Sequence, residues 1–273
     1  QVVDYRKSVH ASSHTKDTKD TKSLAATCVD CHGTHDIKKA EDPTSRTYVR
    51  NIVTTCVRCH GDPKVVQKAH IPGGDIGGLY KDSIHGKLQA KGLTVAPTCK
   101  TCHGVHDVLA PNDPAAKIFR GNVASTCGTC HKGAQELYES SVHGTQARSG
   151  NVKAPVCIDC HTTHGIKAGD EEKSRLFKLK ECGTCHEARL ASYGDTYHGQ
   201  VTSLGFSRIA TCADCHRGHD IFPTSDPRSS VNAANRVQTC QRCHPKANEN
   251  FAKYQPHADP KDPKGNFLLY VMS

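Results

Sequence analysis

Cysteine and histidine dominate the chemistry that this chain of 273 residues could perform, with 16 and 19 copies respectively. Every cysteine belongs to a C-x-x-C pair that is followed at once by histidine. The eight copies are Cys28-Cys31-His32, Cys56-Cys59-His60, Cys99-Cys102-His103, Cys127-Cys130-His131, Cys157-Cys160-His161, Cys182-Cys185-His186, Cys212-Cys215-His216 and Cys240-Cys243-His244. Two thiols at this spacing can reach the two vinyl groups at one edge of a porphyrin, and the next imidazole can then reach the iron. The pattern therefore predicts covalent attachment of eight haem c groups.

Other uses of C-x-x-C do not explain the histidine that follows each pair. A redox dithiol, a zinc knuckle or eight disulfides would leave that position free to vary. Histidine occupies 19 of 273 positions, so eight coincidences would have odds on the order of one in a billion, and the haem interpretation is the one we adopt.

A second set of histidines recurs with the motifs. Four motifs extend to C-x-x-C-H-x-x-H and alternate with four plain ones, and a Tyr-x-x-Ser/Thr-x-His element opens each group of two. The C-H-x-x-H histidines are His35, His106, His164 and His219, and the S/T-x-H histidines are His10, His85, His143 and His198. We therefore divide the chain into four dihaem repeats, approximately 5–79, 80–137, 138–192 and 193–257, followed by a tail, 258–273.

The number of histidines matches the number of axial positions on eight irons. The motif histidines fill eight positions, and the two further classes supply eight more. The sole methionine is Met272, so the sequence predicts bis-histidine ligation throughout, which favours low potentials. Because its own haem blocks the way, the C-H-x-x-H histidine is expected to ligate a neighbouring haem; the alternative is a contact with a propionate.

Three histidines remain outside these classes. For His14 and His70 we expect a surface position or a propionate contact. His257 follows Cys240 by 17 residues, close to the 16 that separate Cys127 from His143. It is therefore expected either to close the last haem of this chain or to ligate a haem in another copy.

Large apolar side chains are too few for an ordinary core: 36% of residues are hydrophobic, aromatic residues make up 5%, and tryptophan is absent. Such a chain is expected to fold around what it binds. The predicted fold is a single octahaem domain over 1–273, mainly irregular with short α-helices, built on a chain of stacked haems with little or no β-sheet. The tract at 15–22 is expected to be an exposed loop, and 71–80 a flexible surface loop.

The formal charge of the polypeptide is +9. Each haem brings two propionates, so eight haems shift the total to roughly +1 when oxidised and roughly −7 when reduced. The basic residues are therefore expected to be propionate partners, and no basic cluster with interleaved aromatic residues predicts nucleic-acid binding. No signal peptide or membrane span is recognisable, and Gln1 fits a mature N-terminus after export. We expect an extracellular or cell-surface location, with the periplasm as the alternative.

These motifs resemble those of prokaryotic multihaem cytochromes of respiratory electron export. The resemblance covers roughly 5–257 and rests on the alternation of C-x-x-C-H-x-x-H with C-x-x-C-H after each S/T-x-H element. The group includes periplasmic modules attached to quinone-oxidising membrane cytochromes, although this chain shows no anchor, and subunits of extracellular cytochrome nanowires. In nanowire subunits a ligand often crosses the subunit interface, a part that His257 or His10 could play.

The resemblance and the ligand count predict an electron conduit that performs no catalysis. Its expected partners are other redox proteins, extracellular electron acceptors or, in a filament, further copies of the chain. One alternative is a multihaem reductase of a small nitrogen or sulfur oxyanion, which would need an open axial position. The other is a monomeric periplasmic electron shuttle.

Overall fold

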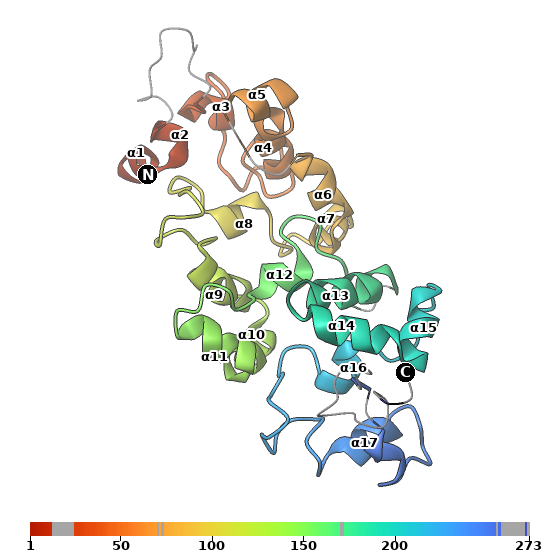
Figure 1. Cartoon of the computed structure of the whole chain (residues 1–273). Coiled ribbons are helices and arrows are strands. Elements are labelled where there is room, and N and C mark those ends of the chain that lie inside the picture. The colour runs from red at the N-terminus through yellow and green to blue at the C-terminus, as the bar shows by residue number, and fades with distance from the viewer. Residues whose placement is uncertain are drawn as a thin grey trace. The chain divides into compact units, whose positions relative to one another are not determined.

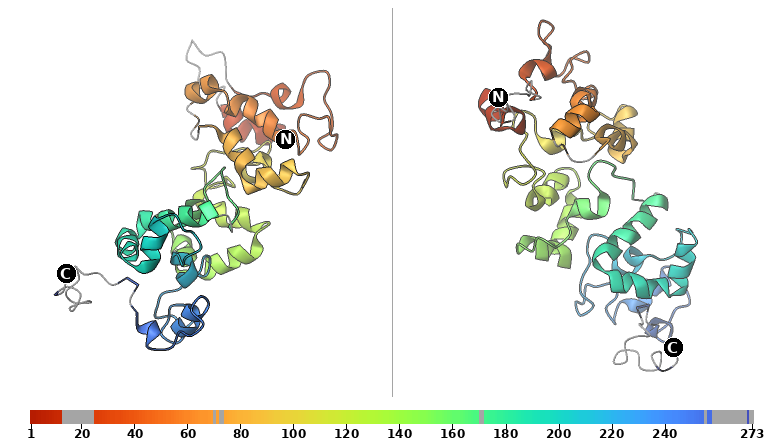
Figure 2. Two further views of the ribbon diagram at one scale, coloured as in Figure 1. Left: turned by 90° about the vertical axis from the view of Figure 1, so that its right-hand side faces the viewer. Right: turned by 45° about the horizontal axis from the view of Figure 1, so that its top comes forward.

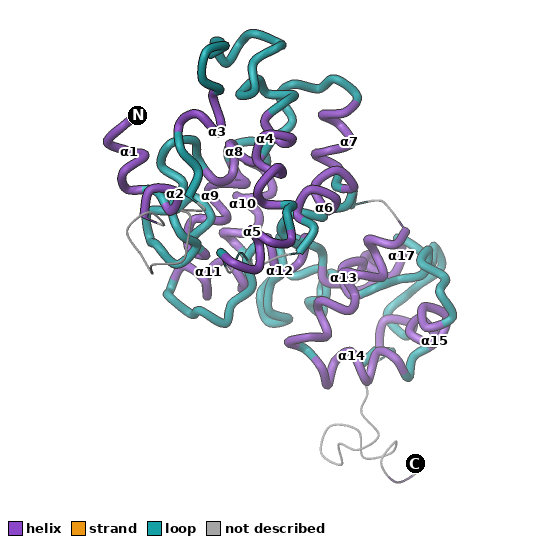
Figure 3. The backbone as a smooth tube through the Cα atoms, turned by 90° about the horizontal axis from the view of Figure 1, so that it is seen from above, coloured by secondary structure: helices purple, strands orange, loops and turns teal. Residues whose placement is uncertain are grey.

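The computed structural model describes residues 1–12, 25–69, 71, 74–169, 172–254, 256–257 and 271. Over these residues the chain contains short helices joined by loops and no strand, which confirms the predicted helices without a β-sheet (Figures 1 and 3). The expectations for 15–22, for His14 and His70 and for Met272 fall on residues outside this range. The chain forms two compact units, one of residues 1–131 and 161–168 and the other of residues 132–160 and 169–273.

The helices of the described residues are short, and Figure 2 shows them alternating with loops in two further views. Up to the fourth C-x-x-C-H motif they are α1 (Val2–Lys7), α2 (Val9–Ser12), α3 (Cys28–His32), α4 (Ile52–His60), α5 (Pro63–Lys68), α6 (Ile76–Asp82), α7 (Ile84–Ala90), α8 (Cys99–His103), η1 (Arg120–Asn122) and α9 (Val123–Gly128). After it they are α10 (Lys132–Ser140), α11 (Val142–Arg148), α12 (Cys157–His161), α13 (Glu172–Cys185), α14 (Glu187–Gly194), α15 (Tyr197–Ser203), α16 (Cys212–His216), α17 (Arg236–Gln241) and η2 (Phe251–Lys253).

The first motif of every repeat forms a five-residue helix, namely α3, α8, α12 or α16. A helix of this length is unstable alone, and local side chains cap it. At α3, the Thr27 backbone N–H and hydroxyl both donate to the Asp30 carboxylate at 2.6 Å. The same capping box occurs at α8 and α16. The sequence T-C-x-D/T-C-H therefore encodes its own helix start.

Each of these four helices ends at a residue with positive φ. The residues are Gly33 (+84°), Gly104 (+88°), Thr162 (+66°) and Arg217 (+68°). A left-handed residue stops a helix and redirects the chain. It separates the motif histidine from the second histidine of C-H-x-x-H, so the two imidazoles do not share one helix face.

In the first repeat, the second C-x-x-C-H motif lies at the C-terminal end of a longer helix, α4. The loop that leads into α4 is held by Asn51, whose Nδ2 donates to the carbonyls of Pro43 and Ser45 at 2.9 and 2.8 Å. Asn122 and Asn235 make the matching contacts in the second and fourth repeats. In the third repeat α13 takes the place of this loop, which explains why its two motifs are 25 residues apart instead of 28.

The Tyr-x-x-Ser/Thr-x-His element is a helix break with a built-in cap. In the third repeat the Ser141 hydroxyl donates to the Tyr138 carbonyl at 2.6 Å and accepts from the Gly144 N–H at 3.1 Å, which starts α11. The Tyr138 hydroxyl donates to the Pro155 carbonyl at 2.9 Å. This bond ties the helix of His143 to the segment before Cys157, and Tyr5, Tyr80 and Tyr193 make equivalent bonds.

The segment 71–80 departs from its prediction as a flexible loop. Asp75 caps α6 by accepting from the Gly78 N–H at 2.8 Å, and 76–80 are helical. Gly77 and Gly78 are tolerated in the first turn of α6 because the acidic cap precedes them. The loop interpretation is therefore wrong for residues 76–80.

Among the described residues, few large apolar side chains are buried. They are Ile52, Val53, Val123, Val156, Leu179 and Tyr193, and the other buried apolar residues are alanines. The polypeptide therefore has only a small core of its own.

Candidate functional site

Seven pairs of imidazole rings lie in the described residues at one nearly constant separation, 6.1–6.2 Å between centroids. Each pair contains one histidine from a C-x-x-C-H motif. The pairs are His60 with His10, His32 with His106, His131 with His85, His103 with His164, His186 with His143, His244 with His198 and His216 with His257.

This separation fits two imidazoles on opposite faces of one iron. A metal–imidazole bond is about 2.0 Å long, and the ligating nitrogen lies about 1.1 Å from the ring centre, so coaxial ligands have centroids about 6.2 Å apart. Aromatic pairs in contact spread over about 4.5–7 Å. The angle between the ring planes ranges from 6° for His103–His164 to 67° for His10–His60, as expected where each ring can rotate about its bond to a shared ion.

The S/T-x-H histidines pair within their own repeat. His10, His85, His143 and His198 each face the motif histidine at the second C-x-x-C-H of the same repeat. In three of these elements the next residue is glycine, and an ideal Cβ at Gly144 would lie 2.1 Å from the Tyr138 carbonyl oxygen. The glycine therefore lets the histidine helix start against the preceding helix.

The C-H-x-x-H histidines pair with the preceding repeat. His106 faces His32, and His164 faces His103, each at 6.1 Å. One short loop thus connects the motif histidine of its own repeat to a histidine that faces a motif histidine of the repeat before it. The ligand roles of His161 and His219 remain predictions.

His257 has a different partner from the one expected. It lies 6.1 Å from His216, at the seventh motif, and its Nδ1 lies 3.3 Å from the Ser192 hydroxyl. It takes the position that a C-H-x-x-H histidine of a following repeat would occupy. His10 and His257 both pair within the chain, whereas His35 is exposed and has no ring partner among the described residues.

All 16 cysteines are free thiols, as thioether formation with haem requires. The last motif of one repeat and the first motif of the next come together at their first cysteines. The thiols of Cys56 and Cys99 form a hydrogen bond that raises the pKa of Cys56 and lowers that of Cys99. Cys182 and Cys212 form the same contact with the same effect. Loss of the thiol protons on haem attachment would leave the two attachment points adjacent.

Within a repeat, the second cysteine of the first motif lies near the second motif. Burial raises the pKa of Cys160 to about 11, and Cys182 is the next largest cause. Burial likewise raises the pKa of Cys102, with Cys127 next in effect, and that of Cys215, with Cys240 next. In each unit the motifs therefore follow one another in sequence order.

Burial favours the neutral form of several of the paired imidazoles. Burial is the largest cause of a lowered pKa at His60, His103, His164 and His216, and a facing histidine adds to it at His103 and His216. A neutral ring keeps a lone pair for coordination. Among the described residues no group of three or more His, Cys, Asp or Glu side chains is arranged to hold a bare metal ion, and the sites are instead imidazole pairs.

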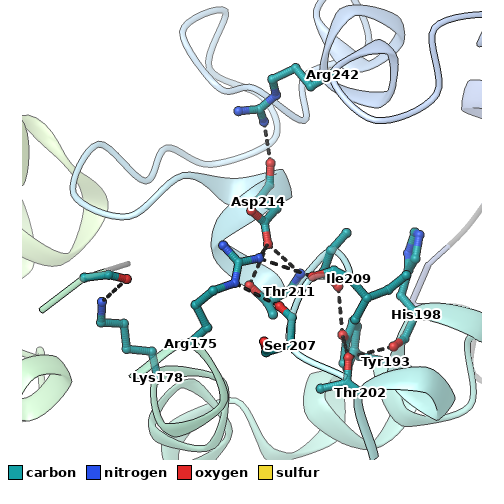
Figure 4. A network of polar contacts seen from close by, with 12 residues as sticks. Arg175, Lys178, Tyr193, His198, Thr202, Ser207, Ile209, Thr211, Asp214 and Arg242 are labelled. Atoms are coloured by element: carbon teal, nitrogen blue, oxygen red, sulfur yellow. Dashed lines mark hydrogen bonds and ion pairs between the residues drawn. The ribbon is translucent and has the colours of Figure 1, made fainter. Parts of the chain in front are cut away.

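A polar network holds the seventh motif in place (Figure 4). Arg175 of α13 donates to the carbonyls of Ser207 and Ile209 at 3.0 and 3.2 Å and to the Asp214 carboxylate at 2.8 Å. That carboxylate also caps α16 by accepting from the Thr211 N–H at 2.7 Å. One carboxylate thus starts the motif helix and anchors it to α13.

Two arginines that the sequence analysis did not single out donate to backbone carbonyls of C-H-x-x-H motifs. Arg58 donates to the Asp30 carbonyl at 2.6 Å, and Arg242 donates to the Asp214 carbonyl. Each stands directly before the second cysteine of a plain motif, CVRCH or CQRCH. The other two plain motifs read CGTCH. This difference between arginine and threonine at one motif position was the sequence signal that could have pointed to Arg58 and Arg242.

Comparison with known proteins gives no relative: no family model, curated protein or solved structure matches the chain. No helix in the described ranges is long and apolar enough to cross a membrane.

Proposed function

We propose that this protein is an electron-transfer protein that carries eight covalently bound haem c groups with histidine on both axial faces. The observation that carries the proposal is the set of seven imidazole pairs at 6.1–6.2 Å, each including a motif histidine. When bound, the haems supply reversible one-electron chemistry. The cysteines would hold each porphyrin edge, and the paired histidines would fix its plane and close both axial positions.

The arrangement of the thiols supports transfer from one haem to the next. Attachment points meet between repeats at Cys56–Cys99 and at Cys182–Cys212, and they approach each other within repeats. A run of closely spaced haems provides successive electron-transfer steps without a mobile carrier. The proposed partners are other redox proteins or extracellular electron acceptors, and haem attachment of this type implies a location outside the cytoplasm.

Two measurements test the proposal. Mass spectrometry of the native protein is expected to give the polypeptide plus eight haems. Electron paramagnetic resonance of the oxidised protein is expected to give low-spin signals, because two imidazoles produce a strong ligand field. A mass without haem would overturn the proposal. A high-spin haem that responds to a nitrogen or sulfur oxyanion would favour the reductase alternative, since catalysis at haem needs an exchangeable position.

A filament of such chains is a second candidate function, and the observation that favours it is His35. His106 and His164 occupy the same motif position and pair with the preceding repeat, whereas His35 is exposed. It is therefore available to a haem of another copy. Concentration-dependent association of the haem-loaded protein, measured by sedimentation and lost in His35→Ala, would support assembly. Single particles at all concentrations would support the monomeric shuttle.

A further inference from the structure

The first and fourth repeats share a contact that the second and third lack. Arg58 donates to the Asp30 carbonyl, which lies 28 residues earlier, and Arg242 donates to the Asp214 carbonyl across the same interval. Both arginines precede the second cysteine of a plain motif, and both acceptors precede the second cysteine of a C-H-x-x-H motif. Each arginine therefore links the two attachment motifs of its own repeat.

Threonine occupies the equivalent position in the two other repeats, and it acts only locally. The Thr129 hydroxyl donates to the Thr126 carbonyl at 2.8 Å, and the Thr184 hydroxyl donates to the Glu181 carbonyl at 2.7 Å. A neutral hydroxyl bonded within its own turn places no charge near the other motif. The chain thus contains its own comparison between a charged and an uncharged version of one site.

The guanidinium of Arg58 is held at one end by a hydrogen bond and at the other by the covalent attachment of its side chain. At 2.6 Å from the Asp30 carbonyl oxygen it lies beside the backbone that carries Cys31, and its own side chain is attached next to Cys59. Arg242 is placed in the same way: its side chain is attached next to Cys243, and its guanidinium donates to the Asp214 carbonyl, directly before Cys215.

In the third repeat a lysine outside the C-x-x-C-H motifs, Lys178, donates to the Gly169 carbonyl at 3.5 Å. Lysine carries its charge on a flexible stem, whereas arginine is permanently charged and holds a fixed hydrogen-bonding geometry.

We infer that Arg58 and Arg242 are positioning residues that hold the two haem-attachment motifs of the first and fourth repeats together and raise the reduction potentials of the haems attached there. The inference rests on the proposed function. A fixed positive charge close to a porphyrin stabilises the reduced state, which carries one more negative charge than the oxidised state. No bond or proton changes in this effect.

The test is a redox titration of the haem-loaded full-length protein with substitutions taken from the chain's own repeats. Arg58→Thr is expected to lower the potential of at least one haem of the first repeat. The expected size is on the order of a tenfold change in the ratio of reduced to oxidised haem, or about 59 mV for one electron. Arg242→Thr is expected to do the same in the fourth repeat, and Thr129→Arg to do the opposite in the second.

Two further variants separate charge from structure. Arg58→Lys keeps the charge and loses the fixed geometry, so it is expected to retain most of the wild-type potential. Arg148→Thr is the matched control, because Arg148 also donates to a backbone carbonyl, that of Glu139 at 2.9 Å, but lies outside the C-x-x-C-H motifs. It is expected to leave every potential unchanged.

The inference is overturned if Arg58→Thr titrates like wild type, or if the Lys and Thr variants shift equally. Mass spectrometry on each variant separates this outcome from failure of the proposed function, which would appear as missing haem in the wild-type protein.

Discussion

His257 lies 6.1 Å from His216, centroid to centroid, with 33° between the ring planes. The separation equals that of His103 and His164, although His257 belongs to no C-x-x-C-H motif. A turn at 256–257 thus supplies the imidazole that a further repeat would otherwise provide. The first motif histidine of the fourth repeat, His216, is therefore paired within this chain.

The first prediction concerns this pair. In the haem-loaded protein, His257→Ala is expected to convert one haem of eight from low spin to high spin, because the iron held by His216 loses its second imidazole. Electron paramagnetic resonance of the oxidised protein measures the change. His35→Ala in dilute solution is the control and is expected to keep the wild-type spectrum. A fully low-spin His257→Ala protein would contradict the assignment.

The sequence identified the candidate site residues because covalent haem attachment demands residue types at fixed spacing. It could not identify the pairs. A histidine three residues after the motif histidine can face either direction along the chain, and the left-handed residue between them, present at both Gly33 and Gly104, does not distinguish His35 from His106. His257 was expected at the register of an S/T-x-H histidine, and it takes the C-H-x-x-H position instead.

The fold was predictable in class but not in detail. Sparse apolar residues and frequent Pro and Gly indicated short helices without a sheet. Residues 76–80 were misjudged because their glycines suggested a loop, whereas one cap at Asp75 is enough to start α6. The role of Arg58 depends on a carbonyl 28 residues away, and local sequence does not contain such contacts.

The second prediction tests the glycine that follows the S/T-x-H histidine. Gly144→Ala is expected to destabilise the protein by about 1–3 kcal/mol, because an ideal Cβ there would lie 2.1 Å from the Tyr138 carbonyl oxygen. Denaturant unfolding followed by circular dichroism measures the loss. Gly133→Ala in α10 is the matched control. Its Cβ would meet nothing within 4 Å, so it is expected to stabilise by about 0.5–1 kcal/mol. Equal effects at the two glycines would exclude the steric explanation.

The third prediction concerns backbone strain at Thr162, a β-branched residue with φ of +66°. Its hydroxyl is buried and makes no hydrogen bond within the described residues. Thr162→Gly removes both penalties and adds some entropy to the unfolded chain, so a net gain of about 1 kcal/mol in unfolding free energy is expected. Thermal unfolding measures it. The reverse exchange, Gly104→Thr, places a side chain at φ +88° with its Cβ 2.7 Å from the Asp107 carboxylate, and is expected to destabilise. Unchanged stability of Thr162→Gly would show that the strain is relieved locally.

The fourth prediction is that the polypeptide does not fold without its haems. The large apolar residues buried in the described structure, such as Ile52, Val123 and Leu179, are few, and apolar burial is the main term that offsets chain entropy. Five-residue helices such as α3 and α8 add no independent stability, even with capping boxes. Each helix is expected to form only when thioether bonds and iron ligation fix its cysteines and histidine.

Expression without haem attachment is therefore expected to give a chain with little far-ultraviolet helical signal and no cooperative unfolding transition. A double substitution of Cys28 and Cys31 by alanine provides the graded control. It removes one attachment site in the first repeat, so the remaining haems should preserve most of the helical signal. Cooperative unfolding of the haem-free chain with near-native helix content would contradict this prediction. It would show that the small apolar core stabilises the fold by itself and that the haems bind to a fold that is already formed.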